Sequence, residues 1–439
     1  MNYTNMVFRI FFQVGHGLFA MEHCKGINSI YDCGSTKKSN IESSIDRSVN
    51  LLKFLQDKPT DDKPIDIDNL FISHYDKDHV NGLKKLLSDY NVKRIFLPML
   101  SNLSKLVCSE FQKDKDIKDL IIDPEKFIHT LSPNTIIILI EENSLPPENI
   151  SEMPLIKLSE IEKYANSVGN ITYKCPGCCK FLDRDIWLYI IYNRRVLTSQ
   201  EQAQFMQKLI KKESPSDSEL INELKRKDNK TSLKKILNGI LTEKELQNIN
   251  EYSMVVWSGE CEDESNKHGC LYTGDYNTKK HYDELDRIFF KLKSKTEIIQ
   301  VPHHGSIRYF TTNLYWENAI LVISAQKSSS TKNKQIVNPT DTINKIAKDN
   351  HKSLDTTKGD IMLLSMYCYK PHKLAYKYFL IPTSLSNNAN YTNKLLYTII
   401  DKNKPINQQF SILGKIIKIK SNEPYAKVLF PFEIHPPIC

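Results

Sequence analysis

The sequence has no apolar run close to the roughly 18 residues that a membrane-spanning helix needs. Its N-terminus lacks the small-residue cleavage site of a secretory signal peptide and carries an arginine inside its apolar stretch, which predicts a first strand instead. Disulfide-scaffold density is also absent, because ten cysteines are scattered over 439 residues. These absences predict a cytoplasmic protein with no membrane partner and with free or metal-bound thiols.

Strong charge of one sign is absent as well. Lys and Arg number 60 against 52 Asp and Glu, which leaves a net charge of +8. Hydrophobic residues at 40% and charged residues at 26% indicate a globular chain and exclude wholesale disorder. The mild positive excess suits an anionic partner, such as nucleic acid or a phosphoester, although a Lys- and Asn-rich genome bias explains it equally well.

Apolar residues alternate between strand and helix spacing in the first part of the chain. Residues 7–14 and 28–32 predict strands, 41–56 predicts an amphipathic helix, and 69–73 predicts a short buried strand. A strong apolar run at 135–140 predicts a further strand. This β–α–β alternation predicts an α/β layered fold.

The pattern changes between about 141 and 246, where prolines cluster and a charge-rich stretch at 208–235 has helical spacing. Strands resume at 252–257 and 269–273, and the polar segment between them predicts a hairpin. The predicted organisation is a first half of the fold over 1–140, a mostly helical insertion over 141–246, a second half over 247–385 and a C-terminal extension over 386–439.

The densest concentration of metal-binding side chains follows the strand predicted at 69–73. The segment His74-Tyr-Asp76-Lys-Asp78-His79 places two imidazoles and two carboxylates within six residues. Alternate residues of an extended segment point the same way, so His74 and Asp76 can converge on one cation, while Asp78 and His79 can reach a second. Nitrogen and oxygen donors without thiolates suit zinc, manganese or iron.

Two distant segments carry similar donors at predicted strand ends. Asp275 follows a strand and a glycine, where its carboxylate can bridge two cations, although a helix N-cap is the plain alternative. His303 and His304 follow a strand predicted at 297–301, and exposed loop histidines are the alternative there. The separation of Asp275 and His303 leaves room for one helix and one strand, so adjacent strands can bring both groups to one edge.

These blocks resemble the metallo-β-lactamase superfamily, especially its branch related to the hydrolase domain of the DNA-uptake protein ComEC. The resemblance covers most of residues 7–365 apart from the insertion. The segments that carry it are Val14-Gly-His16-Gly17, Tyr31-Asp-Cys-Gly34, the motif at 74–79, Thr273-Gly-Asp275, Pro302-His-His-Gly-Ser306, 319–324 and 355–361.

The resemblance implies a four-layered αββα sandwich with an inserted helical subdomain. It implies two divalent metal ions, zinc first and manganese as an alternative. The implied metal ligands are His74, Asp76, Asp78, His79, Asp275 and His303. It further implies that Asp78 orients the attacking water, and that His304 contacts phosphate, stabilises the leaving group or replaces His303 as a ligand.

The sequence departs from that branch at three points. Leu18 stands where an acid commonly follows the opening glycine, and Asn338 precedes Pro339 where a histidine is usual. A further histidine ligand, common in the superfamily, has no clear equivalent. His129 is the only histidine between 80 and 267, and its Phe-Ile-His-Thr-Leu context favours a structural role. The second metal site is therefore predicted to be short of one ligand.

A cysteine-rich turn, Cys175-Pro-Gly-Cys178-Cys179, offers half of a zinc knuckle. Cys261, His268 and Cys270 are possible partners in the sequence, and buried free thiols are the equally weighted alternative.

Three functions remain open at this point. The first is a phosphodiesterase or nuclease that uses metal-activated water. The second is a hydrolase of a small phosphoester, lactone or thioester. The third is a non-catalytic sensor or binding protein that kept the fold.

Overall fold

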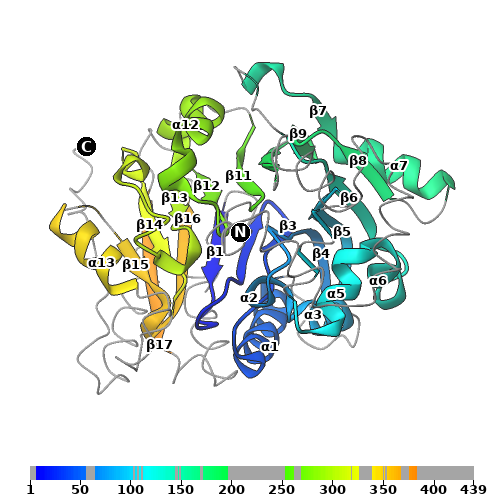
Figure 1. The fold of residues 1–439 in the computed structure, drawn as a ribbon, viewed down its shortest axis with the longest axis horizontal. Coiled ribbons are helices and arrows are strands. Elements are labelled where there is room, and N and C mark those ends of the chain that lie inside the picture. Colours follow the sequence, from blue (N-terminus) through cyan, green and yellow to red (C-terminus); the bar gives the residue numbers. More distant parts are fainter. Residues whose placement is uncertain are drawn as a thin grey trace, which may run out of the picture.

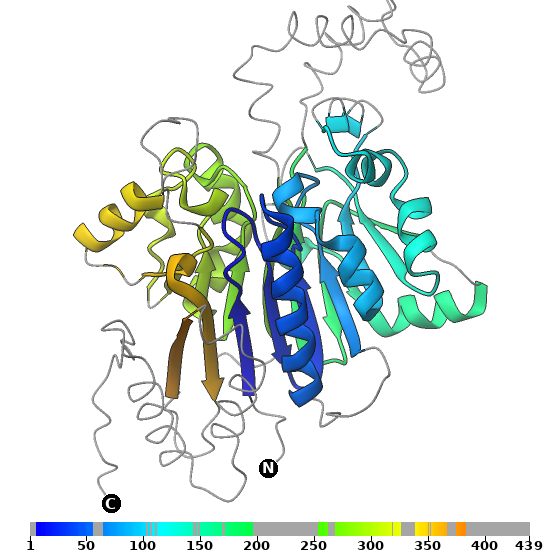
Figure 2. The same cartoon turned by 90° about the horizontal axis from the view of Figure 1, so that it is seen from below.

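Two mixed β-sheets lie face to face with helices on their outer sides (Figures 1 and 2). The computed structural model describes most of residues 6–382, apart from 56–64, 196–252, 262–267, 326–338, 367–374 and several shorter gaps. The four-layered αββα sandwich predicted from the sequence is confirmed. None of the helices in these ranges is both long and apolar enough for a membrane span.

Parallel strands bring several carboxyl ends to one edge of each sheet. Among the described residues, one sheet has the strand order β17 (Ala375–Pro382), β16 (Gly359–Met366), β1 (Met6–Phe11), β2 (Ala20–Cys24), β3 (Ile27–Tyr31), β4 (Ile65–Phe71), β5 (Tyr90–Pro98), β6 (Ile136–Ile140) and β8 (Thr172–Cys175). The other has the order β15 (Ser353–Asp355), β14 (Ile320–Ile323), β13 (Thr296–Gln300), β12 (Gly269–Tyr272), β11 (Val255–Glu260), β10 (Trp187–Tyr192), β9 (Cys178–Asp183) and β7 (Leu155–Lys157). Strands β3 to β6 run parallel, as do β12 to β15.

Helices cover the outer face of each sheet. The nine-stranded sheet is covered by α1 (Lys38–Leu55), α2 (Lys77–Val80), α3 (Leu83–Asp89), α5 (Lys115–Ile122) and α6 (Pro124–Leu131). The other is covered by α12 (Thr278–Phe289) and α13 (Pro339–Lys348), while α7 (Leu158–Val168) packs against β7 and β9. Ile41, Ile45 and Leu52 of α1 are fully buried, as the helical spacing predicted.

Stacked aromatic rings join the two sheets. The ring of Tyr31 lies 3.5 Å from that of Tyr272 on the opposite sheet, centroid to centroid, and 4.9 Å from that of Phe71. Trp187 and Tyr189 are fully buried in the same core. Each such side chain contributes about 1.5–3 kcal/mol by leaving water, so this layer fixes the separation of the sheets and the relative position of their strand ends.

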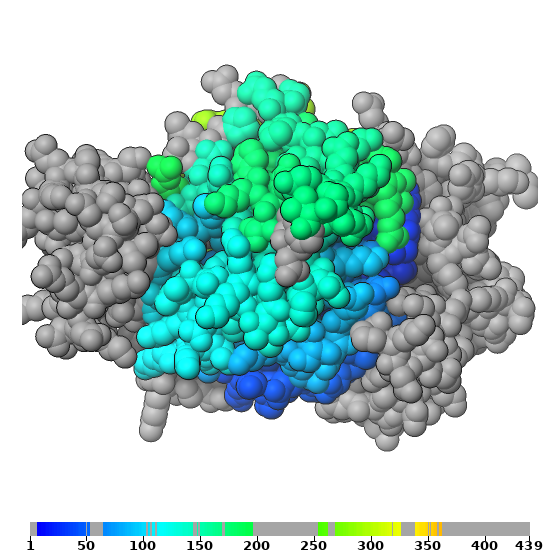
Figure 3. All heavy atoms as spheres, turned by 90° about the vertical axis from the view of Figure 1, so that its right-hand side faces the viewer, coloured from blue at the N-terminus to red at the C-terminus, as the bar shows by residue number. Residues whose placement is uncertain are grey.

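The described part of the region 141–246 differs from the mostly helical insertion that the sequence predicted. It contains β7, β8, β9 and β10, which belong to the two sheets, with α7 beside them. Figure 3 shows residues 150–195 in green, forming one surface with the cyan segment that holds α5 and α6. Strands β9 and β10 are buried on both faces, which hides the alternation by which strands are recognised. Residues 196–246, with the charge-rich stretch, and the extension over 386–439 lie outside the described residues.

Candidate metal centre

The predicted site residues lie at strand ends that reach one edge of the sandwich. The segment 74–79 follows β4, Asp275 follows β12, and His303 follows β13. Strands β12 and β13 pair in parallel, and α12 lies between them in the chain. The helix-and-strand spacing predicted between Asp275 and His303 is therefore confirmed, and it places both residues at the same edge.

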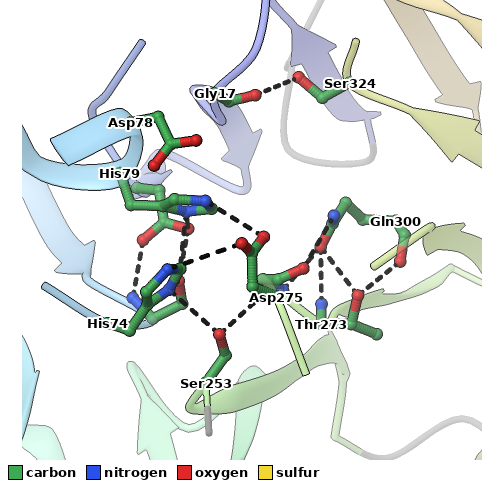
Figure 4. A network of polar contacts seen from close by, with 12 residues as sticks. Gly17, His74, Asp78, His79, Ser253, Thr273, Asp275, Gln300 and Ser324 are labelled. Carbon is green, nitrogen blue, oxygen red and sulfur yellow. Dashed lines mark hydrogen bonds and ion pairs between the residues drawn. The ribbon is translucent and has the colours of Figure 1, made fainter. Parts of the chain in front are cut away.

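Two overlapping groups of possible metal ligands form at this edge in the described part of the chain. One comprises His74, His79 and Asp275, and the other comprises Asp78, His79 and His304. Nε2 of His79 lies 3.2 Å from Oδ1 of Asp275, and Nε2 of His74 lies 3.8 Å from its Oδ2 (Figure 4). His79 belongs to both groups, so two cations bound there would share or compete for its imidazole.

Asp32, directly after β3, orients His79. Its Oδ1 accepts a hydrogen bond from the backbone N–H of Ser73 at 2.7 Å, and its Oδ2 accepts one from Ser73 Oγ at 2.7 Å. The same Oδ2 lies 2.8 Å from Nδ1 of His79. A carboxylate only accepts, so Nδ1 of His79 donates and Nε2 is directed to Asp275. In the sequence, Asp32 is recognisable only as an acid that follows a strand. Its contact with His79 becomes visible only in the folded structure.

Ser253, just before β11, supports both His74 and Asp275. Its Oγ accepts a hydrogen bond from the backbone N–H of Asp275 at 2.8 Å and lies 3.1 Å from Nδ1 of His74 (Figure 4). Because Ser73 Oγ lies 2.9 Å from the same nitrogen, only Nε2 of His74 is available to the centre. No sequence pattern marked Ser253.

The turn before Asp275 is held by Gln300. Its Oε1 accepts hydrogen bonds from the backbone N–H groups of Thr273 and Gly274, both at 2.8 Å (Figure 4). Gly274 has a φ of +53°, and a Cβ there would lie 2.7 Å from Cβ of Ser73. Glycine is therefore required for β12 to deliver Asp275 beside the 74–79 segment.

The structure brings His304, rather than His303, into a group of possible ligands. Nδ1 of His304 donates to the carbonyl of Ser324 at 3.2 Å, and its Nε2 lies 3.1 Å from Oδ2 of Asp78. Nδ1 of His303 lies 3.8 Å from Oδ2 of Asp275, and its ring packs on Tyr309. Both histidines have left-handed backbone, with φ of 49° and 51°, an arrangement that costs free energy and is typical of functional sites.

Two residues of the 74–79 segment belong to neither group of possible ligands. Asp76 lies in neither group, and its Oδ1 accepts a hydrogen bond from Nε2 of Gln112 at 3.1 Å. Tyr75 is buried, and its hydroxyl donates to the carbonyl of Pro98 at 2.7 Å. Asp76 is still extended, with φ of -72° and ψ of 151°, and α2 begins at the next residue.

The charged groups at the centre shift one another's pKa values. Burial would raise the pKa of Asp275, but His303, His79 and His304 outweigh it and hold that pKa well below its usual value. Burial would lower the pKa of His79, but Asp275 and Asp32 raise it well above its usual range. Burial, helped by nearby His79, lowers the pKa of His74 to about 4. The buried carboxylates therefore require a positive charge beside them, from a proton or a cation.

No protein-family model matches the sequence, and the comparison with curated proteins finds no match. Among solved structures, the chain is similar to the metallo-beta-lactamase fold protein YhfI from Bacillus subtilis. The two are 9% identical with a TM-score of 0.28, over 80% of this chain and 95% of that one. At that similarity the comparison does not decide the function. The function must be inferred from the chemistry of the site.

The donor atoms of the centre fit a divalent metal ion. Four buried atoms there make no hydrogen bond within the described residues: Nε2 of His74, Nε2 of His79, Oδ1 of Asp275 and Nδ1 of His303. The 3.2 Å contact between two of them lacks hydrogen-bond geometry. Buried polar atoms are nearly always paired, so several together at one point indicate a missing ligand. Imidazole nitrogens and carboxylate oxygens are donors that zinc and manganese accept.

Other candidate ligands lie elsewhere. His129 is on α6, and its Nε2 lies 3.3 Å from the carbonyl of Thr135, in agreement with a structural role. Cys175 and Cys179 are buried in the core between the sheets, and burial raises the pKa of the Cys175 thiol to about 12. Neither possible ligand group found among the described residues includes a cysteine. The buried-thiol alternative thus describes these side chains better than a zinc knuckle does.

Proposed function

We propose that the protein is a metal-dependent hydrolase of the metallo-β-lactamase superfamily that cleaves phosphodiester bonds by means of activated water. One observation carries the proposal. Segments far apart in the chain converge at one edge of the sandwich, and four of their buried imidazole and carboxylate atoms make no hydrogen bond with the residues that the structure describes. We propose His74, His79 and Asp275 as ligands of one cation, and Asp78, His79 and His304 as ligands of a second, with zinc or manganese as the ions.

When bound, a divalent cation lowers the pKa of a water molecule and stabilises negative charge on the reacting group. The chain itself holds the donors in place. Asp32 fixes the ring of His79, and Ser253 fixes His74 and Asp275 relative to each other. Asp78, which is partly exposed and 3.1 Å from Nε2 of His304, can accept a hydrogen bond from the attacking water. We propose that His304 either binds the second cation or hydrogen-bonds the oxygen of the leaving group.

A phosphodiester, with nucleic acid as the favoured form, is supported by the net charge of +8 and by the resemblance to the ComEC-related branch. A small phosphoester, lactone or thioester would use the same activated water. Rates on bis(4-nitrophenyl) phosphate, single-stranded DNA, plasmid DNA and a chromogenic lactone separate these substrate classes.

The test is metal content measured together with hydrolysis on the full chain. Purified protein should retain stoichiometric zinc or manganese and cleave a phosphodiester. His74→Ala and the double variant Asp78→Ala/His79→Ala should lose both while keeping the far-UV circular dichroism of the parent. His129→Ala, which removes a histidine of α6, is the matched control. Full activity in the first two variants, or a parent that binds no metal, would contradict the proposal, and the latter would favour a sensor on this fold.

A further inference from the structure

Besides His303, a second histidine beside the centre belongs to neither ligand group. His16 lies in the loop between β1 and β2, within the segment Val14-Gly-His16-Gly17. Backbone hydrogen bonds hold this loop: Thr36 N–H donates to the carbonyl of His16 at 2.7 Å, and Leu18 N–H donates to the carbonyl of Asp78 at 3.2 Å. Ser324 Oγ donates to the carbonyl of Gly17 at 2.8 Å (Figure 4). The loop is thus tied to the same segments that present Asp78 and His304.

The imidazole of His16 lies beside the centre, but the described residues do not fill its hydrogen-bonding capacity. Its ring lies 6.1 Å from the ring of His304, in an edge-on arrangement. Its Nδ1 is buried and has no hydrogen-bond partner in the described part of the chain, while the side chain as a whole is partly exposed. Burial, with the nearby charge of His304, lowers the pKa of His16 to about 4.

His23, a histidine outside the centre, differs from His16. Nδ1 of His23, on β2, lies 2.6 Å from Oδ1 of its neighbour Asn28, which satisfies the ring within the fold. His16 has no comparable partner among the described residues, and it belongs to neither group of possible metal ligands found there. A partly exposed imidazole with an unpaired ring nitrogen, near Asp78 and His304, is suited to contact a bound molecule.

We infer that His16 is a substrate-contacting residue, whose imidazole hydrogen-bonds an oxygen of a phosphoryl group held beside His304. The phosphoryl identity of the substrate rests on the proposed function. The contact itself rests on the hydrogen-bonded loop, the 6.1 Å ring separation and the nitrogen that is unpaired among the described residues.

The experiment compares the parent, His16→Ala, His16→Gln and the control His129→Ala, each as the full chain loaded with zinc or manganese. Metal content is measured by mass spectrometry, binding of inorganic phosphate by calorimetry, and hydrolysis of bis(4-nitrophenyl) phosphate by kcat and KM. Losing one hydrogen bond to an anion should weaken phosphate binding and raise KM by about 10- to 100-fold in His16→Ala. Metal content should not change, and His16→Gln should recover part of the affinity.

The outcomes separate the two proposals. Unchanged phosphate affinity and KM in His16→Ala would overturn the inference, as would loss of metal, which would make His16 a ligand. A fall in kcat alone, with phosphate affinity kept, would also overturn it. A parent that binds phosphate in a His16-dependent manner but cleaves no phosphodiester would refute the proposed function and leave the contact standing. A parent that binds no phosphate would overturn the contact.

Discussion

Strand β4 connects two buried polar clusters that differ in one respect. At Asn69 the cluster is closed: Arg94 donates to Asn69, Asp183 and Glu162 at 2.7–2.9 Å, and Asn69 donates to Asp183 at 2.8 Å. At His74, just beyond the end of the strand, buried ring nitrogens and a carboxylate oxygen make no hydrogen bond with any residue that the structure describes. Both clusters are buried and charged, so burial and charge alone do not identify a site. The difference lies in which atoms have partners.

A closed cluster stabilises the fold, whereas an open one depends on a ligand to complete it. An unpaired buried polar atom costs about 1–3 kcal/mol, a cost that a protein recovers when a bound cation supplies the missing contact. Changes in the Asn69 cluster should therefore act on stability, and changes at the centre should act on metal binding and catalysis.

The largest effect is expected from a substitution that disrupts the open cluster at His74. His74→Ala should reduce phosphodiester hydrolysis by about 10⁴-fold, equivalent to about 5 kcal/mol of transition-state stabilisation, because a proposed ligand is lost. Bound metal, measured by mass spectrometry, should fall with it. An unfolding midpoint close to that of the metal-free parent would show that the fold survives, and an active, metal-loaded variant would place the chemistry elsewhere.

Breaking the closed cluster should have the opposite profile. Arg94→Ala leaves the carboxylate of Asp183 buried without its cation and should lower the free energy of unfolding by about 3–5 kcal/mol. Metal content per folded molecule should stay at the parent value. Lys157→Ala, which removes an exposed ion pair with Asp185, is the control and should leave the unfolding midpoint unchanged. Equal stability in all three proteins would remove the distinction between the clusters.

Adding metal should close the open cluster. Zinc at about 100 times its dissociation constant should raise the free energy of unfolding by about 2.7 kcal/mol, because the native state binds the ion through Asp275 and its neighbours. Denaturant titrations with and without a chelator measure this change. His74→Ala should show a much smaller increase, and an equal increase in both proteins would mean that the ion binds at another place.

The smallest predicted effect tests the support of the centre. Asp32→Asn keeps the size of the side chain but removes the charge beside Nδ1 of His79, so metal affinity should fall by about 10- to 100-fold. Competition with a chromophoric chelator measures it. Asp46→Asn, on the exposed part of α1, should bind metal as the parent does. If both variants bind alike, Asp32 serves only the backbone turn at Ser73.

Local sequence predicted the centre better than it predicted its support. The spacing within 74–79 and the strand ends before Asp275 and His303 sufficed to bring those segments together. Ser253 escaped prediction because its role depends on a strand pairing that no local pattern encodes. The strands β9 and β10 were missed for a related reason, since sheet residues buried on both faces show no period of two. The choice between His303 and His304 depends on two left-handed backbone angles, which a sequence does not specify.

The parallel strand pairs have a consequence for the opposite edge of the sandwich. The turn at Lys25–Gly26 between β2 and β3 and the turn at Arg184–Asp185 between β9 and β10 lie there, joined by a hydrogen bond from Arg184 to the carbonyl of Gly26 at 2.9 Å. These turns carry none of the metal donors. Changes in their length or sequence should therefore have little effect on the rate of hydrolysis. The end of the sandwich opposite the metal centre should therefore tolerate more substitutions than the end that holds the donors. Affinity tags or reporter domains are best inserted at that far end.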